Sequence, residues 1–427
     1  MDSPVKDMLD AYCKTSPLRY HMPGHKGKIE INGAHDVTEL KQSDDLYDPI
    51  GALAIMEDML ACRIGCERVL ALTDGSSAGV RIIFMVLAEH CKGKKVLIAD
   101  DMHRSAIDGC ILSGLDAVVV PSQSLYDRLD DTVGGVFITS PSYYGEMADL
   151  RSLYARCESL GIILAVDEAH GAHLPYCGLP CAAQIADISV QSMHKTMGAL
   201  TQSATLCINL PELIITAKYY RRMLCTSSPS FLVLESMEWA SNQYIEKVHE
   251  FIKRVQELRS YLSLGYANVK TFPIYDPTRL CLQMSPHMTG YRAAEILQEQ
   301  GIVVEMADND CIVLILTPHD DDYGRLIDAL TSLNDVNGGD YSPLPSAPKP
   351  RFVTDMRSAA LSYKDFVLPE KAIGKISAAC LGAYPPGIPC IYPGCIIDEQ
   401  TVEYLLAVQG CTEIFGLIDG AIAVVDE

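Results

Sequence analysis

A lysine and an aspartate, far apart in the sequence, are the residues of this chain best suited to do chemistry. Lys195 lies in the run QSMHKT (191–196), after an apolar segment and before Gly198. Asp167 ends an earlier apolar run, GIILAVD (161–167). A lysine amine can condense with an aldehyde, and a carboxylate can keep a pyridine nitrogen protonated. Together they predict a site for pyridoxal 5'-phosphate (PLP), and with it carbanion chemistry next to an amine.

The turn TDGSSAG (73–79) is the candidate phosphate cradle. Gly75 lets the backbone approach an anion, and Ser76 and Ser77 can donate their hydroxyls. The helix that follows offers free N–H groups and a favourable dipole. An ordinary serine helix cap is the alternative. The presence of Lys195 and Asp167 in the same chain favours the phosphate cradle over the helix cap.

Three further candidates lie in loops after apolar runs, where open α/β sheets bind their ligands. His103 follows KVLIAD and could stack on the cofactor ring, or have no role. Ser140 follows GGVFI and could contact the hydroxyl side of the ring. His170 could orient Asp167 or line the pocket, and a purely structural histidine is the alternative.

Short apolar runs that alternate with helical patterns must position these residues. Continuous apolar strands separated by helices indicate a mostly parallel sheet covered on both faces, so we predict an α/β fold. The predicted strands of the first unit are 95–100, 117–121, 134–140, 161–167, 188–192 and 203–209. After a mainly helical stretch, those of a second unit are 269–275, 278–285, 302–307 and 311–317.

The same patterns predict how the chain divides into domains. The stretch 335–351 holds several prolines and glycines, which indicates a linker or an extended arm. The expected division is an N-terminal arm (1–50), a PLP-binding large domain (51–235), a small α/β domain (236–334), the linker (335–351) and a C-terminal α+β domain (352–427).

Composition limits the partners. The net charge of −21 disfavours nucleic acid and anionic membranes and would attract small cations. Neither a membrane span nor a signal peptide pattern is found, so we expect a cytoplasmic protein. The sixteen cysteines lack zinc spacing, and we interpret them as reduced core residues. His21 and His25 flank a Pro-Gly turn, so no metal is expected there.

Eight segments, in order along nearly the whole chain, resemble the ornithine/lysine/arginine decarboxylases in their short bacterial form. These are PLP-dependent enzymes of fold type I, the aspartate-aminotransferase fold. Large members carry an extra N-terminal wing domain, for which this chain has no room. The matching segments are LRYHMPGHKG (18–27), DDLYDPIGAL (44–53), TDGSSAG (73–79), DMHRSAIDG (101–109), VDEAHGAH (166–173), SMHKTMGALTQSA (192–204), CTSSPS (225–230) and AYPPGIPCIYPG (383–394).

The resemblance assigns roles to individual residues. It implies that Lys195 binds the cofactor covalently, that Asp167 pairs with the pyridine nitrogen and that His103 stacks on the ring. It implies a homodimer at least, in which the active site is shared between subunits, because the hydroxyls of Ser227 or Ser228 would reach the neighbour's cofactor. The residues implied to hold the phosphate are Ser76, Ser77, Ser192 and His194.

Two positions depart from the family pattern. Tyr47 follows DDL where histidine is usual, and Cys395 stands where the family commonly has an acid after YPPGIP. If that acid helps to recognise a cationic side chain, the substrate stays open among lysine, arginine and ornithine.

The expected reaction is decarboxylation of one of these amino acids to its amine, with Lys195 or His194 returning a proton to Cα. Polyamine supply and acid tolerance are both fitting settings. The alternatives are another reaction of the same fold type (aminotransfer, elimination or decarboxylation of a non-basic amino acid), a non-catalytic cofactor-binding protein, and a structural oligomer component.

Overall fold

A seven-stranded sheet forms the centre of the computed structural model, which describes residues 4–426 except 92, 267, 285, 321–322, 337–343 and 385–386. The strand order is β2-β8-β7-β6-β5-β3-β4. The run from β7 to β4 is parallel, whereas β8 is antiparallel to both of its neighbours. The mostly parallel sheet is therefore confirmed. Its strands are β2 (Arg68–Leu72), β3 (Lys95–Ala99), β4 (Ala117–Val120), β5 (Val133–Thr139), β6 (Ile163–Asp167), β7 (Ile188–Ser192) and β8 (Ala204–Ile208).

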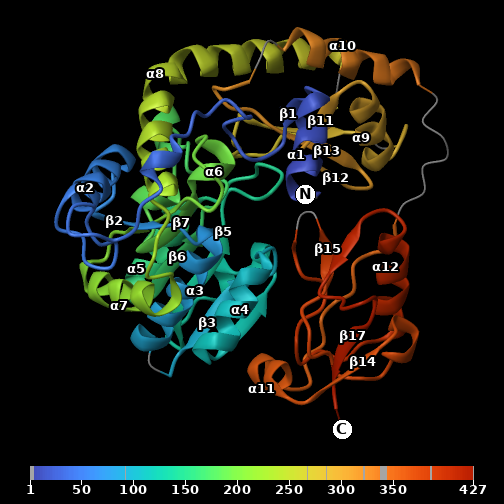
Figure 1. The fold of residues 1–427 in the computed structure, drawn as a ribbon. Helices are drawn as coiled ribbons and strands as arrows, with labels where there is room; N and C mark the ends of the chain where they lie inside the picture. The colour runs from blue at the N-terminus through green and yellow to red at the C-terminus, as the bar shows by residue number, and fades with distance from the viewer. Residues whose placement is uncertain are drawn as a thin grey trace.

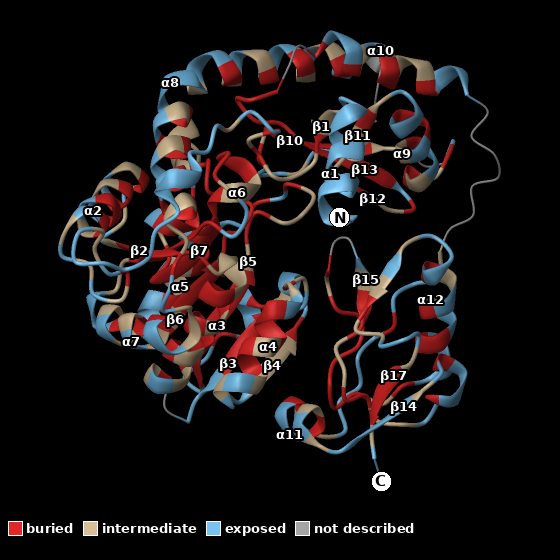
Figure 2. Ribbon diagram, in the orientation of Figure 1, coloured by how far each residue is buried: buried red, intermediate tan, exposed pale blue. Residues whose placement is uncertain are grey.

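Helices bury both faces of this sheet, as continuous apolar strands require (Figures 1 and 2). Alternate residues of β5 belong to different cores: Phe137 packs on Phe84, with ring centroids 4.8 Å apart, whereas Val136 belongs to the core that contains Leu153. The first core lies under α3 (Gly75–His90), α4 (Arg104–Ser113) and α7 (Ile214–Leu224), and the second lies under α5 (Leu150–Leu160). Helix α2 (Ala52–Ile64) packs in a third core.

The long helix α8 (Phe231–Tyr261) leads from the large sheet to a smaller unit (Figure 1). That unit is an antiparallel sheet, β12-β13-β10-β9, with helices α9 (Gly290–Glu299) and α10 (Gly324–Ser332). Its strands are β9 (Asn268–Val269), β10 (Arg279–Gln283), β12 (Met306–Ala307) and β13 (Cys311–Ile315). The prediction of a strand over 269–275 was wrong beyond Val269. Pro273 lacks a backbone N–H, which explains why pairing does not extend over it.

The N-terminal arm joins the small unit. It contains α1 (Pro4–Lys14) and β1 (Leu18–Tyr20), and β1 pairs in parallel with β11 (Ile302–Val304). This pairing carries the segment HMPGHKG, which follows β1, towards the large sheet. The chain between β1 and α2 forms no other strand in the part that the structure describes.

The last part of the chain forms a separate lobe beside α4 (Figure 1). Arg357 of α11 (Met356–Leu361) donates a hydrogen bond to the carbonyl of Leu112, 2.9 Å away. The lobe also contains α12 (Glu399–Gln409), the strand pair β14 (Lys364–Val367) with β17 (Ile422–Val425), and the pair β15 (Gly382–Tyr384) with β16 (Glu413–Phe415). Of the expected linker, 337–343 lie outside the described residues, and 344–350 form neither helix nor strand. No helix among the described residues could cross a membrane.

Candidate active site

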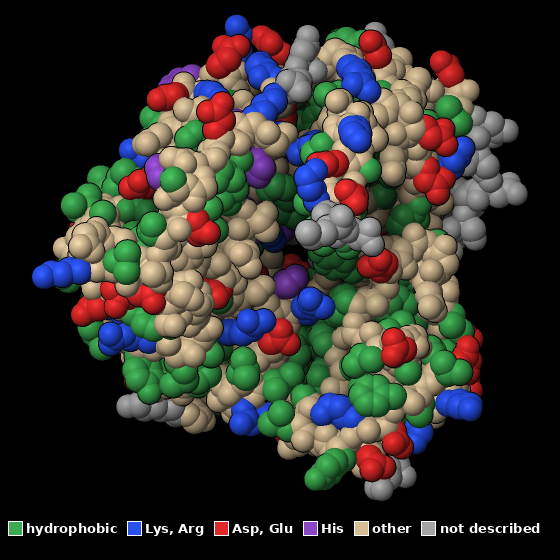
Figure 3. Space-filling model, viewed as in Figure 1, with side chains coloured by type: hydrophobic (Ala, Val, Ile, Leu, Met, Phe, Trp, Pro, Cys, Tyr) green, Lys and Arg blue, Asp and Glu red, His purple; other side chains and the backbone are tan. Residues whose placement is uncertain are grey.

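A cavity of about 550 Å³ opens at the carboxyl ends of the parallel strands. Its lining residues follow β3, β5, β6 and β7, and others come from the N-terminal arm and the C-terminal lobe. In Figure 3 this region is a hollow near the middle of the molecule. Parallel strands bring their carboxyl ends to one edge of the sheet, so residues distant in sequence converge there.

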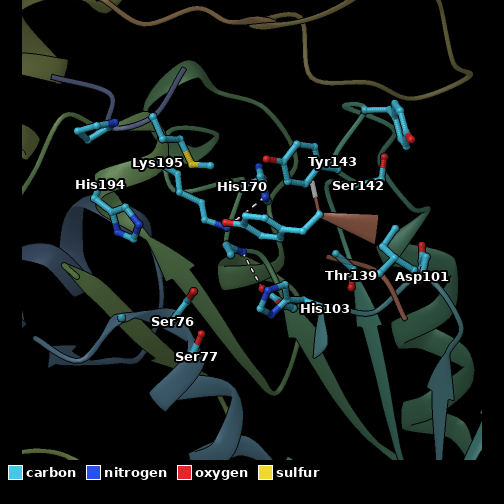
Figure 4. Close-up of a pocket in the computed structure, with 18 of the residues that line it drawn as sticks. Ser76, Ser77, Asp101, His103, Thr139, Ser142, Tyr143, His170, His194 and Lys195 are labelled. Atoms are coloured by element: carbon cyan, nitrogen blue, oxygen red, sulfur yellow. Dashed lines mark hydrogen bonds between the residues drawn. The ribbon is translucent and has the colours of Figure 1, made fainter. Parts of the chain in front are cut away.

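Lys195 lies in the short helix α6 (Met193–Thr196), directly after β7. Its side chain extends into the cavity, and its Nζ lies 3.2 Å from Nε2 of His170 (Figure 4). Burial lowers the pKa of the Lys195 amine, and the carboxylate of Asp167 opposes that effect. An amine with a lowered pKa is a better nucleophile near neutral pH.

Asp167 ends β6 and faces the same cavity. The side chain is only 4% exposed, and Oδ1 accepts a hydrogen bond from the backbone N–H of Ala169 at 2.9 Å. Burial raises the pKa of this carboxyl, and the nearby Lys195 amine offsets that effect only in part. A pyridinium nitrogen would add a cationic partner for the carboxylate, so this residue fits the predicted cofactor.

The start of α3 has the properties of a phosphate site. Asp74, at the N-cap, makes no capping hydrogen bond with its side chain. The N–H of Gly75 donates to the carbonyl of Gln202 at 2.8 Å, so the N–H groups that an anion could use begin at Ser76. Ser76 and Ser77 line the cavity, and Ser192 Oγ donates to Ser76 Oγ at 2.7 Å. Gly75 has a φ of +76°, a conformation that glycine adopts without strain. The cradle is therefore shaped for a phosphate.

His194 and His103 both present neutral rings to the cavity. Nδ1 of His194 lies 3.1 Å from the carbonyl oxygen of Ser203, and burial lowers the pKa of His194 to about 4. Nδ1 of His103 accepts a hydrogen bond from the N–H of Ser105 at 3.2 Å, and burial lowers its pKa to about 3. A neutral imidazole can stack on a pyridinium ring without charge repulsion. Gly387 of the C-terminal lobe packs on the edge of His103.

Four predicted residues lie outside the lining of this cavity. Ser192 is fully buried and contacts the lining through its hydrogen bond to Ser76. Ser140 is 1% exposed, and its hydroxyl accepts a hydrogen bond from the N–H of Ala148 at 3.1 Å. Its neighbours Thr139 and Ser142 line the cavity instead. Ser227 and Ser228 are exposed before α8 and do not reach the cavity of their own chain.

Arg279 is a site residue that sequence reasoning missed. It begins β10, is 2% exposed, and its Nη2 donates to Nδ1 of His170 at 2.9 Å. The ring of Tyr143 packs against His170 with centroids 4.7 Å apart. Nothing in an apolar strand of the second unit signals a role at the first sheet. Asp101, also missed, lines the cavity two residues before His103, and its place after β3 was a usable signal.

The arm segment HMPGHKG packs on the turn that carries Lys195. The N–H of Gly24 donates to the carbonyl of His194 at 2.8 Å, and a Cβ at Gly24 would lie 3.1 Å from the Lys195 carbonyl oxygen. Lys26 is buried and donates to the carbonyls of His21 and Ile315. The backbone of this motif thus contacts the turn that bears Lys195 directly. Among the described residues no cluster suited to a metal is found.

The two departures from the family pattern lie away from the cavity. The hydroxyl of Tyr47 donates to the carbonyl of Cys225 at 2.8 Å. Cys395 is fully buried, and burial raises its pKa to about 11. A thiol in that position cannot pair with a substrate cation. All sixteen cysteines are free, and most of them are buried.

A lysine amine and a carboxylate that can keep a pyridine nitrogen protonated thus converge at one edge of a sheet of this topology. That combination defines a PLP-dependent enzyme of fold type I. Family models narrow the class further. Residues 128–286 match the model "Orn/Lys/Arg decarboxylase, major domain", and residues 357–416 match "Orn/Lys/Arg decarboxylase, C-terminal domain". The chain belongs to the Orn/Lys/Arg decarboxylase family, which confirms the resemblance.

Individual relatives agree with this assignment. The chain is 27% identical to an arginine decarboxylase of Bacillus subtilis, over 95% of this chain and 93% of that protein. It is 28% identical to an arginine decarboxylase of Bacillus anthracis, over 95% and 92%. The constitutive lysine decarboxylase of E. coli has a similar fold, with a TM-score of 0.72, 17% identity, and coverage of 99% of this chain and 78% of that one.

Proposed function

We propose that this protein decarboxylates a basic amino acid to the corresponding primary amine and CO2, with PLP as its cofactor. The observation that carries the proposal is that Lys195 and Asp167 face one cavity in a member of this family. One proton is consumed in each turnover, because the carboxylate carbon leaves as neutral CO2 and Cα takes up a proton in its place.

Bound PLP supplies the electron sink that receives the bonding electrons of the departing carboxylate. Asp167 holds a proton at the pyridine nitrogen, which keeps the ring electron-poor. Lys195 holds the cofactor between turnovers and can return the proton to Cα. His170 contacts the Lys195 amine at 3.2 Å, whereas His194 is tied to Ser203 beside the phosphate site. We therefore favour Lys195, supported by His170, over His194 as the proton donor.

The carboxylates of Asp101 and Glu146 support a cationic substrate. Apart from Asp167, they are the only carboxylates among the described residues that line the cavity. Oδ1 of Asp101 is buried and has no hydrogen-bond partner in the described part of the chain. A guanidinium or ammonium group placed there would pair with it. We propose that Asp101 and Glu146 replace the acid that Cys395 cannot provide.

Arginine is the first substrate to test, because several relatives bear the name arginine decarboxylase. We further propose a cytoplasmic homodimer that serves polyamine supply, with Ser227 and Ser228 of each subunit contributing to the partner's site. The exposure of both serines, away from the cavity of their own chain, supports that arrangement.

The test supplies purified holo-protein with arginine, lysine, ornithine and the uncharged control norleucine, and detects CO2 and amine. One basic amino acid should give both products in equal amounts, and norleucine should give neither. Lys195→Ala should remove turnover and the cofactor trapped by borohydride. Keto acid or ammonia in place of CO2 would instead establish another reaction of the same fold type, and no product from any amino acid would contradict the proposal.

A further inference from the structure

Arg279 is buried beside the active site, and among the described residues it lacks the ion-pair partner that a buried arginine usually has. It is 2% exposed, and its shortest contact runs from Nη2 to Nδ1 of His170 at 2.9 Å. A longer one runs from Nη1 to the carbonyl of Tyr143 at 3.4 Å, and Nε has no partner among the described residues. Burying a guanidinium against a neutral imidazole is costly compared with an ion pair. The cost suggests a function beyond packing.

The chemistry of the donors determines where the proton of His170 lies. A guanidinium carries hydrogen-bond donors only, so Nδ1 of His170 must accept and cannot carry a proton. A neutral imidazole then carries its proton on Nε2. That nitrogen lies 3.2 Å from Nζ of Lys195, so the N–H of His170 donates to the lysine nitrogen. Figure 4 shows this contact.

A nitrogen that accepts a hydrogen bond must have a lone pair, so Lys195 is held as the free amine. A protonated Lys195 would bring an N–H towards the N–H of His170. The opposite tautomer of His170 would bring an N–H towards Arg279. Both arrangements place donors against donors in a buried site. Before the cofactor is captured, the chain Arg279–His170–Lys195 therefore has one satisfactory set of protons.

We propose that Arg279 is a positioning residue that fixes His170 as the Nε2-protonated tautomer and so keeps Lys195 unprotonated for attack on the cofactor aldehyde. This inference rests on the proposed role of Lys195. In that step the amine lone pair forms a C–N bond, and the aldehyde oxygen leaves as water with the two amine protons. An ammonium would first have to lose a proton to bulk solvent.

The surrounding groups set the pH range over which this control acts. Those that interact with the Lys195 amine or the His170 ring come from several elements, and they are Asp167, Glu305, His103 and His194, in addition to Arg279. The two carboxylates favour the ammonium form of Lys195, whereas burial and Arg279 favour the amine. Removing the guanidinium therefore removes one influence on the amine and also frees the tautomer of His170.

The test compares Arg279→Met with Arg279→Lys, which keeps a charged donor, and with Arg63→Met as a control on α2. The first measurement is a long-range 15N–1H correlation spectrum of the histidine rings in the apo-protein, with His170→Gln used to assign the signal. His170 should be protonated on Nε2 in the native chain and in Arg279→Lys. In Arg279→Met a substantial fraction should be protonated on Nδ1.

The second measurement is the rate at which apo-protein captures PLP, followed by absorbance across pH without any amino acid. In Arg279→Met capture should be about tenfold slower at neutral pH, equivalent to a rise of about one unit in the pKa of the amine. Arg279→Lys should recover most of the rate, and Arg63→Met should match the native chain. An Nδ1-protonated His170 in the native protein, or an unchanged capture profile in Arg279→Met, would overturn the inference. Neither measurement depends on decarboxylation, so a failure of the proposed function would be seen separately.

Discussion

The buried carboxyl of Asp101 allows a prediction for substrate binding. Burial raises its pKa to about 6, and its Oδ1 has no hydrogen-bond partner in the part of the chain that the structure describes. Substitution Asp101→Asn should raise KM for the basic substrate about tenfold or more, since a charge-assisted hydrogen bond contributes roughly 1.5–3 kcal/mol. It should change kcat less, because the residue would contact the side chain rather than the bond that breaks.

The same carboxyl predicts a pH dependence. A cationic substrate binds the ionised form of Asp101. Its affinity should therefore be highest above about pH 6 and should fall as pH drops through that value. In Asp101→Asn this limb of the pH profile of kcat/KM should be absent. The matched control is Asp100→Asn, whose carboxylate instead accepts hydrogen bonds from Ser122. An unchanged KM in Asp101→Asn would place side-chain recognition elsewhere.

At the scale of the elements, the sequence predicted the site where a strand pattern and a reactive side chain occur in the same segment. Asp167 ends a continuous apolar run, Lys195 follows the strand ISVQS, and parallel strands bring such ends together. Arg279 could not be found in this way, because it reaches His170 from another sheet through tertiary packing. Ser140 was chosen by its place after β5, but a shift of one residue along a strand reverses the side that a residue faces, and Thr139 lines the cavity instead.

We predict that the N-terminal arm positions the turn that bears Lys195, and a substitution at Gly24 can test this. A Cβ at Gly24 would lie 3.1–3.3 Å from backbone atoms between Lys195 and Gly198, which cannot move aside like a flexible side chain. Gly24→Val should therefore weaken PLP binding about tenfold or more, as measured by titration of apo-protein. Gly33→Val is the matched control, since a Cβ there meets nothing within 4 Å. Equal affinities in the two variants would show that the arm does not position the lysine.

At the scale of the whole molecule, a shared active site predicts complementation between subunits. The double variant Ser227→Ala/Ser228→Ala should have low activity, and so should Lys195→Ala. A hybrid dimer of the two would contain one intact site, so a random mixture should recover about one quarter of native activity per subunit.

The control for this experiment mixes Lys195→Ala with Asp167→Asn, whose altered residues line the same cavity of one chain. No hybrid of that pair has an intact site, and activity should not recover. If the serine variant mixture behaves in the same way, or if the serine variant alone is fully active, the two hydroxyls do not serve a neighbouring subunit.

The parts of the cavity come from separate regions of the chain. Groups proposed for the cofactor stand mainly on the central sheet, whereas Tyr384 and Ile388 enter the lining from the C-terminal lobe. Substitutions in that lobe can therefore alter which amino acid the cavity accepts, while Lys195 and Asp167 on the central sheet stay the same. Substrate selectivity can thus change through substitutions of the cavity residues that the C-terminal lobe supplies.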